Sequence, residues 1–116
     1  DVFDPRLQYE PYGQRWIATA TANSGTNNPG LLVAVSQSSN PTGTWNRYFI
    51  DVDRVKDIYA DSPNLGFSRD SIVVQANMFH RTNDEHLSFD VWVFNKASLY
   101  AGAAPHQEPV KADNVV

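Results

Sequence analysis

The apolar residues of this chain fall in short runs that predict β-strands rather than helices. Residues 6–10 show the pattern most simply, because Leu7 and Tyr9 alternate with polar neighbours, as in a half-buried strand. Residues 87–95 also alternate, and there Trp92 and Phe94 are predicted to point outward. Further strands are predicted at residues 15–22, 31–35, 45–52 and 71–79. The pattern predicts an all-β fold.

Turn-forming residues separate these runs. Residues 11–14 (Pro-Tyr-Gly-Gln) predict a tight turn, and residues 23–30 predict a loop rich in Asn, Ser, Gly and Thr. Residues 80–86 predict a polar loop, and residues 53–59 a solvated connector. The chain from residue 101 onward is expected to be loop-like.

The two halves of the chain resemble each other. Pro5 and Pro63 open matching strands 58 residues apart, and Gly43 and Gly102 end matching runs 59 residues apart. This offset also aligns Leu7 with Leu65 and Tyr9 with Phe67. The sequence therefore predicts one repeat at residues 3–52, a linker and a second repeat at 53–102, and a C-terminal tail at 103–116.

A repeat of about 40–50 residues with four strands is typical of a propeller blade. We therefore expect two four-stranded antiparallel propeller blades, with a β-sandwich as the alternative. Two blades alone would leave apolar faces in water. The predicted partners are further copies of the chain or the remaining blades of a longer chain.

Residues 38–45 (Ser-Ser-Asn-Pro-Thr-Gly-Thr-Trp) resemble the Asp-box turn of sialidase-type propellers, Ser-x-Asp-x-Gly-x-Thr-Trp. Ser38, Thr44 and Trp45 match this pattern, Asn40 replaces the aspartate, and Gly43 lies one position later than the box glycine. The wider arrangement resembles blades of secreted bacterial propeller proteins. The resemblance implies a structural turn, in which Asn40 accepts backbone N–H groups, Gly43 adopts a positive φ and Trp45 packs between blades.

Composition excludes several classes of function. The net charge of −4 at pH 7 argues against a nucleic-acid partner, which would require a basic face. No apolar run reaches the roughly 18 residues of a membrane span. The chain has no cysteine, which excludes disulfides and thiolate metal sites. The abundance of Ser, Thr, Asn and Ala favours a secreted or cell-surface bacterial protein.

Candidate ligand-binding residues lie at the openings of the two first strands and among the aromatic residues. Carboxylates and an arginine at the strand openings could hold a sugar by charge-assisted hydrogen bonds, and exposed rings could stack on it. The alternative is structural, with the aspartates capping turns and the rings packing between blades. The candidates are Asp4, Arg6, Tyr12, Trp16, Asp61, Asn64 and Trp92.

The signals for metal binding and catalysis are weaker. His80, Asp84 and His86 could ligate a metal, but a solvated loop is the favoured interpretation and no cofactor is expected. The chain contains no nucleophile elbow, phosphate loop or dinucleotide fingerprint. Glu10 could form a glycosidase carboxylate pair with Asp4 or Asp61.

These observations favour a non-catalytic binding or interaction module with a glycan as its possible ligand. Two alternatives stay open. The chain could be a fragment or subunit of a propeller glycoside hydrolase or polysaccharide lyase, or a purely structural repeat that assembles with itself.

Overall fold

The computed structural model describes residues 1–26, 28–52, 57–103 and 110–113, and in these ranges the chain is all-β with one short helix. The elements are β1 (Val2–Glu10), β2 (Arg15–Ala22), β3 (Gly30–Ser36), β4 (Trp45–Asp51), β5 (Ile58–Phe67), β6 (Ser71–His80), β7 (His86–Asn95), α1 (Lys96–Tyr100) and β8 (Val110–Asp113). The predicted all-β class is confirmed. Each predicted strand is present, with bounds that differ from the prediction by a few residues at most.

The strands form two antiparallel sheets in which each strand pairs with its neighbours along the chain. Sheet 1 has the order β1-β2-β3-β4, and sheet 2 has the order β5-β6-β7-β8. The predicted connector at 53–59 runs into β5 at Ile58, while residues 53–56 lie outside the described residues. No helix in the described ranges is long and apolar enough to cross a membrane.

The region after β7 contains a helix and a strand that the sequence pattern did not predict. Asn95 caps α1, because its side-chain oxygen accepts a hydrogen bond from the backbone N–H of Ser98 at 2.9 Å. Beyond the helix, β8 pairs with the outer edge of β7, with Val110 opposite Val91. Part of the predicted loop-like tail therefore extends sheet 2.

The first strands of the two sheets carry the same irregularity. The register shifts between Phe3 and Arg6 in β1, and between Asp61 and Asn64 in β5. Asp4 has a φ of 53° and Ser62, 58 positions later, a φ of 50°. A bulge with a left-handed residue is thus repeated at the spacing of the two prolines.

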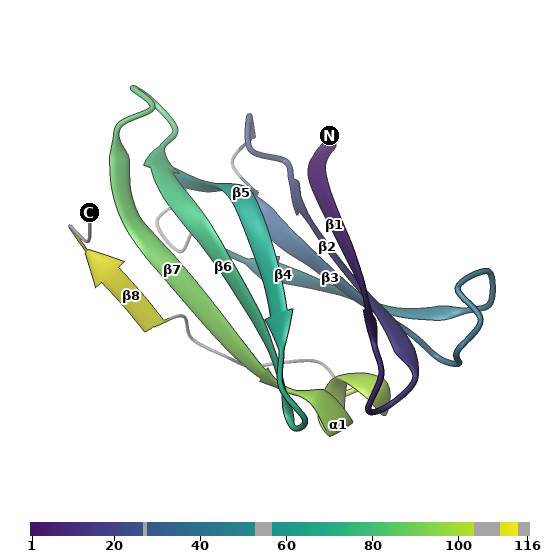
Figure 1. Cartoon of the computed structure of the whole chain (residues 1–116). Helices are drawn as coiled ribbons and strands as arrows, with labels where there is room; N and C mark the ends of the chain where they lie inside the picture. Colours follow the sequence, from purple (N-terminus) through teal and green to yellow (C-terminus); the bar gives the residue numbers. More distant parts are fainter. Residues whose placement is uncertain (27, 53–56, 104–109, 114–116) are drawn as a thin grey trace.

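The two sheets pack against each other through one core, with β1 and β2 lying beside β5 (Figure 1). The Arg6 side chain donates to the carbonyl of Pro63 at 3.2 Å, and that of Gln8 to the carbonyl of Leu65 at 3.1 Å. Helix α1 lies at one end of the molecule (Figure 1) and contributes Leu99 to the same core. The remaining core side chains are Ile17, Leu31, Val33, Val35, Tyr48, Ile50, Val52, Ala60, Leu65, Ile72, Val74, Ala76, Met78, Trp92 and Phe94.

The predicted outward orientation of Trp92 and Phe94 is wrong. Trp92 is only 1% exposed and lies in the core, whereas its neighbour Val93 is 42% exposed. The even-numbered residues of this part of β7 face sheet 1, and the odd-numbered ones face outward. Both faces of β7 are apolar, so alternation alone did not distinguish them.

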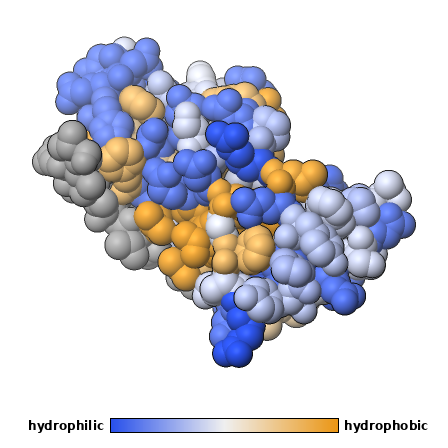
Figure 2. All heavy atoms as spheres, in the orientation of Figure 1, coloured by the Kyte–Doolittle hydropathy of each residue, from blue (hydrophilic) through white to orange (hydrophobic). Residues whose placement is uncertain are grey.

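Each sheet has a second face directed away from the core. On sheet 1 this outer face exposes Leu7, Tyr9 and Phe49, and on sheet 2 it exposes Val93. Figure 2 shows hydrophobic side chains gathered over the middle of the molecule, with hydrophilic ones toward its ends.

Candidate functional site

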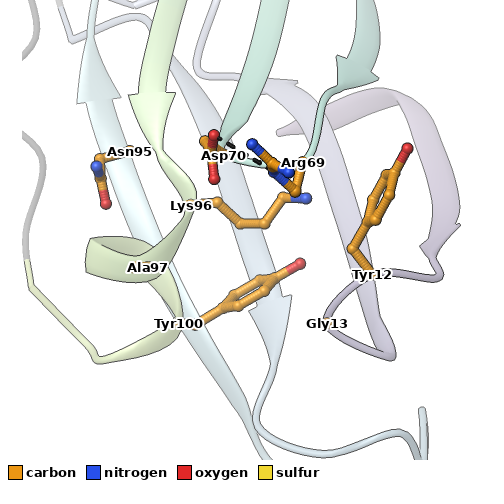
Figure 3. A pocket seen from close by; sticks show the side chains of 8 residues that line it. All are labelled: Tyr12, Gly13, Arg69, Asp70, Asn95, Lys96, Ala97 and Tyr100. Carbon is orange, nitrogen blue, oxygen red and sulfur yellow. Dashed lines mark ion pairs between the residues drawn. The ribbon is translucent and has the colours of Figure 1, made fainter.

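A cavity of about 400 Å³ lies where the β1–β2 turn meets α1 (Figure 3). The β1–β2 turn and the β5–β6 turn form parts of its wall, and the junction of β7 with α1 forms the rest. The lining residues are Tyr12, Gly13, Arg69, Asp70, Asn95, Lys96, Ala97 and Tyr100. Three segments that are distant in sequence therefore build one site.

A buried ion pair supports the floor of this cavity. Glu10, the last residue of β1, is fully buried, and the Nζ of Lys96 lies 3.1 Å from its Oε1. Lys96 also donates to the carbonyl of Ser68. Glu10 accepts two more hydrogen bonds, from the Tyr100 hydroxyl at 2.7 Å and from the Gly13 N–H at 3.0 Å. All these donors converge on one carboxylate.

Gly13 allows this close packing. A Cβ at this position would lie 2.8 Å from the Glu10 Oε1 and 2.8 Å from the Cε2 of Tyr100. Such contacts are too short for real atoms, so any larger residue would displace the carboxylate or the ring. The tight turn predicted at residues 11–14 is present, and Gly13 brings its backbone N–H to Glu10.

The network fixes the protonation states of two groups. Burial by itself raises the pKa of Glu10, but hydrogen bonds from Tyr100, Gly13 and Lys96, together with the Lys96 charge, outweigh burial and lower that pKa below its usual value. Burial raises the pKa of Tyr100, and the hydrogen bond to Glu10 raises it further. Glu10 is therefore an ionised acceptor at neutral pH, and Tyr100 is a neutral donor.

The rim of the cavity combines an exposed ring with charged and polar groups. Tyr12 is 66% exposed, and the Lys96 Nζ lies 5.1 Å from the centroid of its ring. Arg69 and Asp70, from the β5–β6 turn, form an exposed ion pair at 3.7 Å in the same lining (Figure 3). The cavity thus offers an aromatic surface, donors and acceptors to a small polar molecule.

The structure brings two of the predicted strand-opening residues together at a different place. The side chains of Asp4 and Asp61 lie close enough to influence each other. Burial raises the pKa of Asp61, the N–H of Ser62 at 2.8 Å lowers it, and the neighbouring Asp4 side chain and its charge raise it, so the pKa lies above its usual value. Arg6 bonds to Pro63 nearby, whereas Asn64 donates to the side chain of Gln75 at 3.3 Å. None of these residues lines the cavity.

Glu10 does not form the predicted carboxylate pair with Asp4. The two residues lie six positions apart on an extended strand, which separates them by roughly 20 Å at about 3.3 Å per residue. Glycosidase carboxylates lie about 5–9.5 Å apart. Asp61 lies next to Asp4 and so is also far from Glu10. The proposed pairing of Glu10 with either aspartate is therefore wrong.

The predicted aromatic residues do not form one site. Tyr12 lines the cavity, but Trp16 lies on the outer face of sheet 1, where its ring centroid is 5.1 Å from that of Tyr9 and its indole N–H donates to Ser39. Trp92 is buried in the core and cannot contact a ligand without unfolding. The interpretation of Trp92 as a binding residue is corrected accordingly.

The Asp-box-like turn is held by its own side chains. The Asn40 Oδ1 accepts the backbone N–H of Thr42 at 3.0 Å, as expected for a structural turn residue. The Ser38 Oγ accepts the N–H of Asn40 at 3.2 Å, and the Thr44 hydroxyl donates to Gln37 at 2.7 Å. These contacts close the turn between β3 and β4.

Two details of this turn differ from the expectation. Among the described glycines, the one with a left-handed φ is Gly102, so Gly43 does not need a positive φ. Gly43 instead donates its N–H to the carbonyl of Asn40 at 3.1 Å, which closes an ordinary turn. The indole N–H of Trp45 donates to Pro41 at 2.9 Å, and Trp45 is not among the described residues of the core between the sheets.

The weak metal candidates have separate partners. The Nδ1 of His80 lies 2.9 Å from Asp57, and the ring of His86 contacts Phe79 and Phe89. Asp84 accepts the hydroxyl of Tyr59 at 2.8 Å, a bond that helps to raise the Tyr59 pKa to about 12. No group of three or more His, Cys, Asp or Glu residues in the described ranges could hold a metal ion.

Sequence reasoning missed most of the cavity. Lys96 and Tyr100 were not candidates, although Lys96 follows Trp92 and Phe94 in the same alternation. A lysine that continues an inward-facing register needs a buried partner, and this was the one available signal. The sequence indicated Glu10 as a candidate carboxylate, but it did not indicate the partners Tyr100, Gly13 and Lys96.

The chain was also compared with known proteins. No family model, no curated protein and no solved structure matches it. The functional interpretation therefore depends on the geometry of the chain itself.

Proposed function

We propose that this chain is a non-catalytic binding module that takes a carbohydrate in the cavity between the β1–β2 turn and α1. The observation that carries the proposal is that the exposed Tyr12 ring lines this cavity together with the polar side chains of Arg69, Asp70 and Asn95. A sugar ring has an apolar face that can stack on an aromatic ring, and its hydroxyls bond well to charged and amide groups. The volume lies within the range of about 300–1,000 Å³ common for small-molecule sites.

The state of Glu10 supports binding over catalysis. A general acid that works near neutral pH needs a raised pKa, and the pKa of Glu10 is lowered. Its carboxylate already accepts from Tyr100, Gly13 and Lys96. We therefore assign these residues to holding the cavity in shape, with Tyr12 and Arg69 as the groups that meet the ligand.

We also propose that the two sheets are propeller blades. Three features support it: the bulge repeated in β1 and β5, the position of these first strands side by side, and the Asx turn between β3 and β4. Secretion to a bacterial cell surface is proposed from composition and would suit a glycan ligand.

The proposal is tested by a glycan array followed by calorimetric titration of the best ligand. We expect Tyr12→Ala and Arg69→Ala each to weaken binding at least tenfold, while Tyr12→Phe, which keeps the ring, retains most of the affinity. Arg81→Ala, an arginine outside the cavity, is the matched control. The proposal is wrong if no glycan binds, or if Tyr12→Ala binds as tightly as the unmodified chain.

A further inference from the structure

The outer face of sheet 1 is an uncovered apolar surface in the described part of the chain. Leu7 is 59% exposed and Phe49 is 43% exposed, and the rings of Tyr9 and Trp16 lie together on the same face. A second cavity, of about 420 Å³, opens here, lined by Leu32, Val33, Ala34, Arg47, Tyr48 and Phe49. Exposed apolar surfaces of this kind mark interaction sites.

The strand pairings show which residues of sheet 2 correspond to this outer face. Leu7 pairs with Ala18 in sheet 1, and Leu65 pairs with Val74 in sheet 2. In the same way, the pair Tyr9 and Trp16 corresponds to the pair Phe67 and Ile72. The bulges of β1 and β5 lie 58 residues apart, so aligning them gives the same correspondence between the two strands.

The corresponding face of sheet 2 is covered, and what covers it is sheet 1. Ile72 and Val74 are fully buried, Leu65 is nearly so, and all three belong to the core between the two sheets. The outer face of sheet 1 is uncovered. The equivalent face of sheet 2 is covered, because it packs against the preceding sheet.

The converse holds for the outer face of sheet 2. The pairings make Val73 correspond to Ile17 and Val93 correspond to Val35. Ile17 and Val35 are fully buried against sheet 2, whereas Val93 is 42% exposed and Val73 is half-buried. Each of the two faces that form the internal interface therefore has a counterpart on the outside of the chain. One counterpart is the outer face of sheet 1, and the other is the outer face of sheet 2.

We infer that a second copy of this chain covers these faces, so that copies associate head to tail. The outer face of sheet 2 in one copy packs on the outer face of sheet 1 in the next, in the register of the internal interface. The contact is heterologous, and it closes into a ring if the rotation between copies permits. The inference does not depend on the sugar cavity.

The register makes a specific prediction about neighbouring residues. Within the chain, the Gln8 side chain reaches the carbonyl of Leu65. The corresponding residues between copies are Gly66 of one copy and Leu7 of the next. A Cβ added at Gly66 meets no atom within 4 Å, so a cysteine fits there without strain.

Cross-linking tests this prediction directly, because the chain has no cysteine of its own. Leu7→Cys and Gly66→Cys are made in separate chains, mixed, and treated with a short thiol cross-linker. We expect a cross-linked dimer that contains one chain of each kind by mass spectrometry, and little dimer from either variant alone. Keeping the two cysteines in different chains prevents a link within one chain. Gly25→Cys, at an exposed glycine that also has open space for a Cβ, replaces Gly66→Cys in the control mixture.

Three results would overturn the inference. Efficient linking of Leu7→Cys to itself would mean that like faces meet in a two-fold dimer. Equal linking in the Gly25→Cys mixture would mean that the link follows random encounter. The absence of any link, with each variant folded by circular dichroism, would mean that the two outer faces do not meet.

Discussion

At the scale of single residues, the buried pair of Glu10 and Lys96 is the feature with the greatest energetic consequence. Removing one partner of such a pair leaves an uncompensated buried charge, which costs about 3–5 kcal/mol, whereas replacing both partners costs much less. Glu10 also orients Tyr100 and the β1–β2 turn through Gly13, so the pair links sheet 1 to α1.

We expect Glu10→Gln and Lys96→Met each to lower the free energy of unfolding by about 3 kcal/mol. The double variant should lose less than the sum of the two, because neither charge is left alone. Urea denaturation of the four proteins measures this coupling. Asp70→Asn, in an exposed pair, is the control and should change stability little. Strict additivity of the two single variants would show that the pair is not coupled.

The lowered pKa of Glu10 also predicts a dependence of stability on pH. Above the usual carboxyl pKa of 4.5 the stabilisation is fully present, and it is lost as the pH falls through the lower pKa of the folded state. The unfolded chain binds the proton first, so acid favours unfolding.

Denaturation curves at a series of pH values below about 5 would measure this effect. Glu10→Gln should lack the part of the acid-induced loss that Glu10 causes, giving a shallower slope than the unmodified chain. Parallel slopes for the two proteins would mean that Glu10 does not have a lowered pKa in the folded state.

At the scale of elements, alternation and turn residues predicted the strands well. Residues 15–22 were predicted with the bounds that β2 has, because Ala and β-branched Thr alternate there between two clear turns. The five-residue helix α1 was not predicted, since it depends on the Asn95 cap and on bonds from Tyr48 and Asn46 of β4 to its carbonyl groups. The Asn95 cap is a local contact, but the bonds from β4 join residues about 50 positions apart and leave no local pattern.

The turn between β3 and β4 gives a prediction at this scale. Asn40→Ala removes the acceptor of the Thr42 N–H and hydroxyl, which should destabilise the fold by about 1 kcal/mol. Thermal denaturation measures the loss, and sugar binding by the folded variant should be unchanged because the turn does not line the cavity. Ser39→Ala, next to Asn40, is the control. A loss of binding without a loss of stability would assign the turn a functional role.

At the scale of the whole molecule, the offset between the two halves of the sequence has a counterpart in the structure, whereas the cavity as a whole had no signal in the sequence. The 58-residue offset between Pro5 and Pro63 reappears as two bulges and as two first strands that lie side by side. The cavity could not be found in the same way, because it joins the β1–β2 turn to α1, some 85 residues later. Of the predicted ligand residues, only Tyr12 lines it, since the others were chosen from strand openings that meet elsewhere.

The central claim at this scale is that the repeated units of this chain pack on one another in a single manner, within a copy and between copies. Light scattering across a wide range of protein concentration tests it most directly. We predict a mass that exceeds the 13.0 kDa of one chain, and that levels off at a defined multiple of it when the assembly closes into a ring. A folded protein that keeps the mass of a single chain at every concentration would contradict the claim.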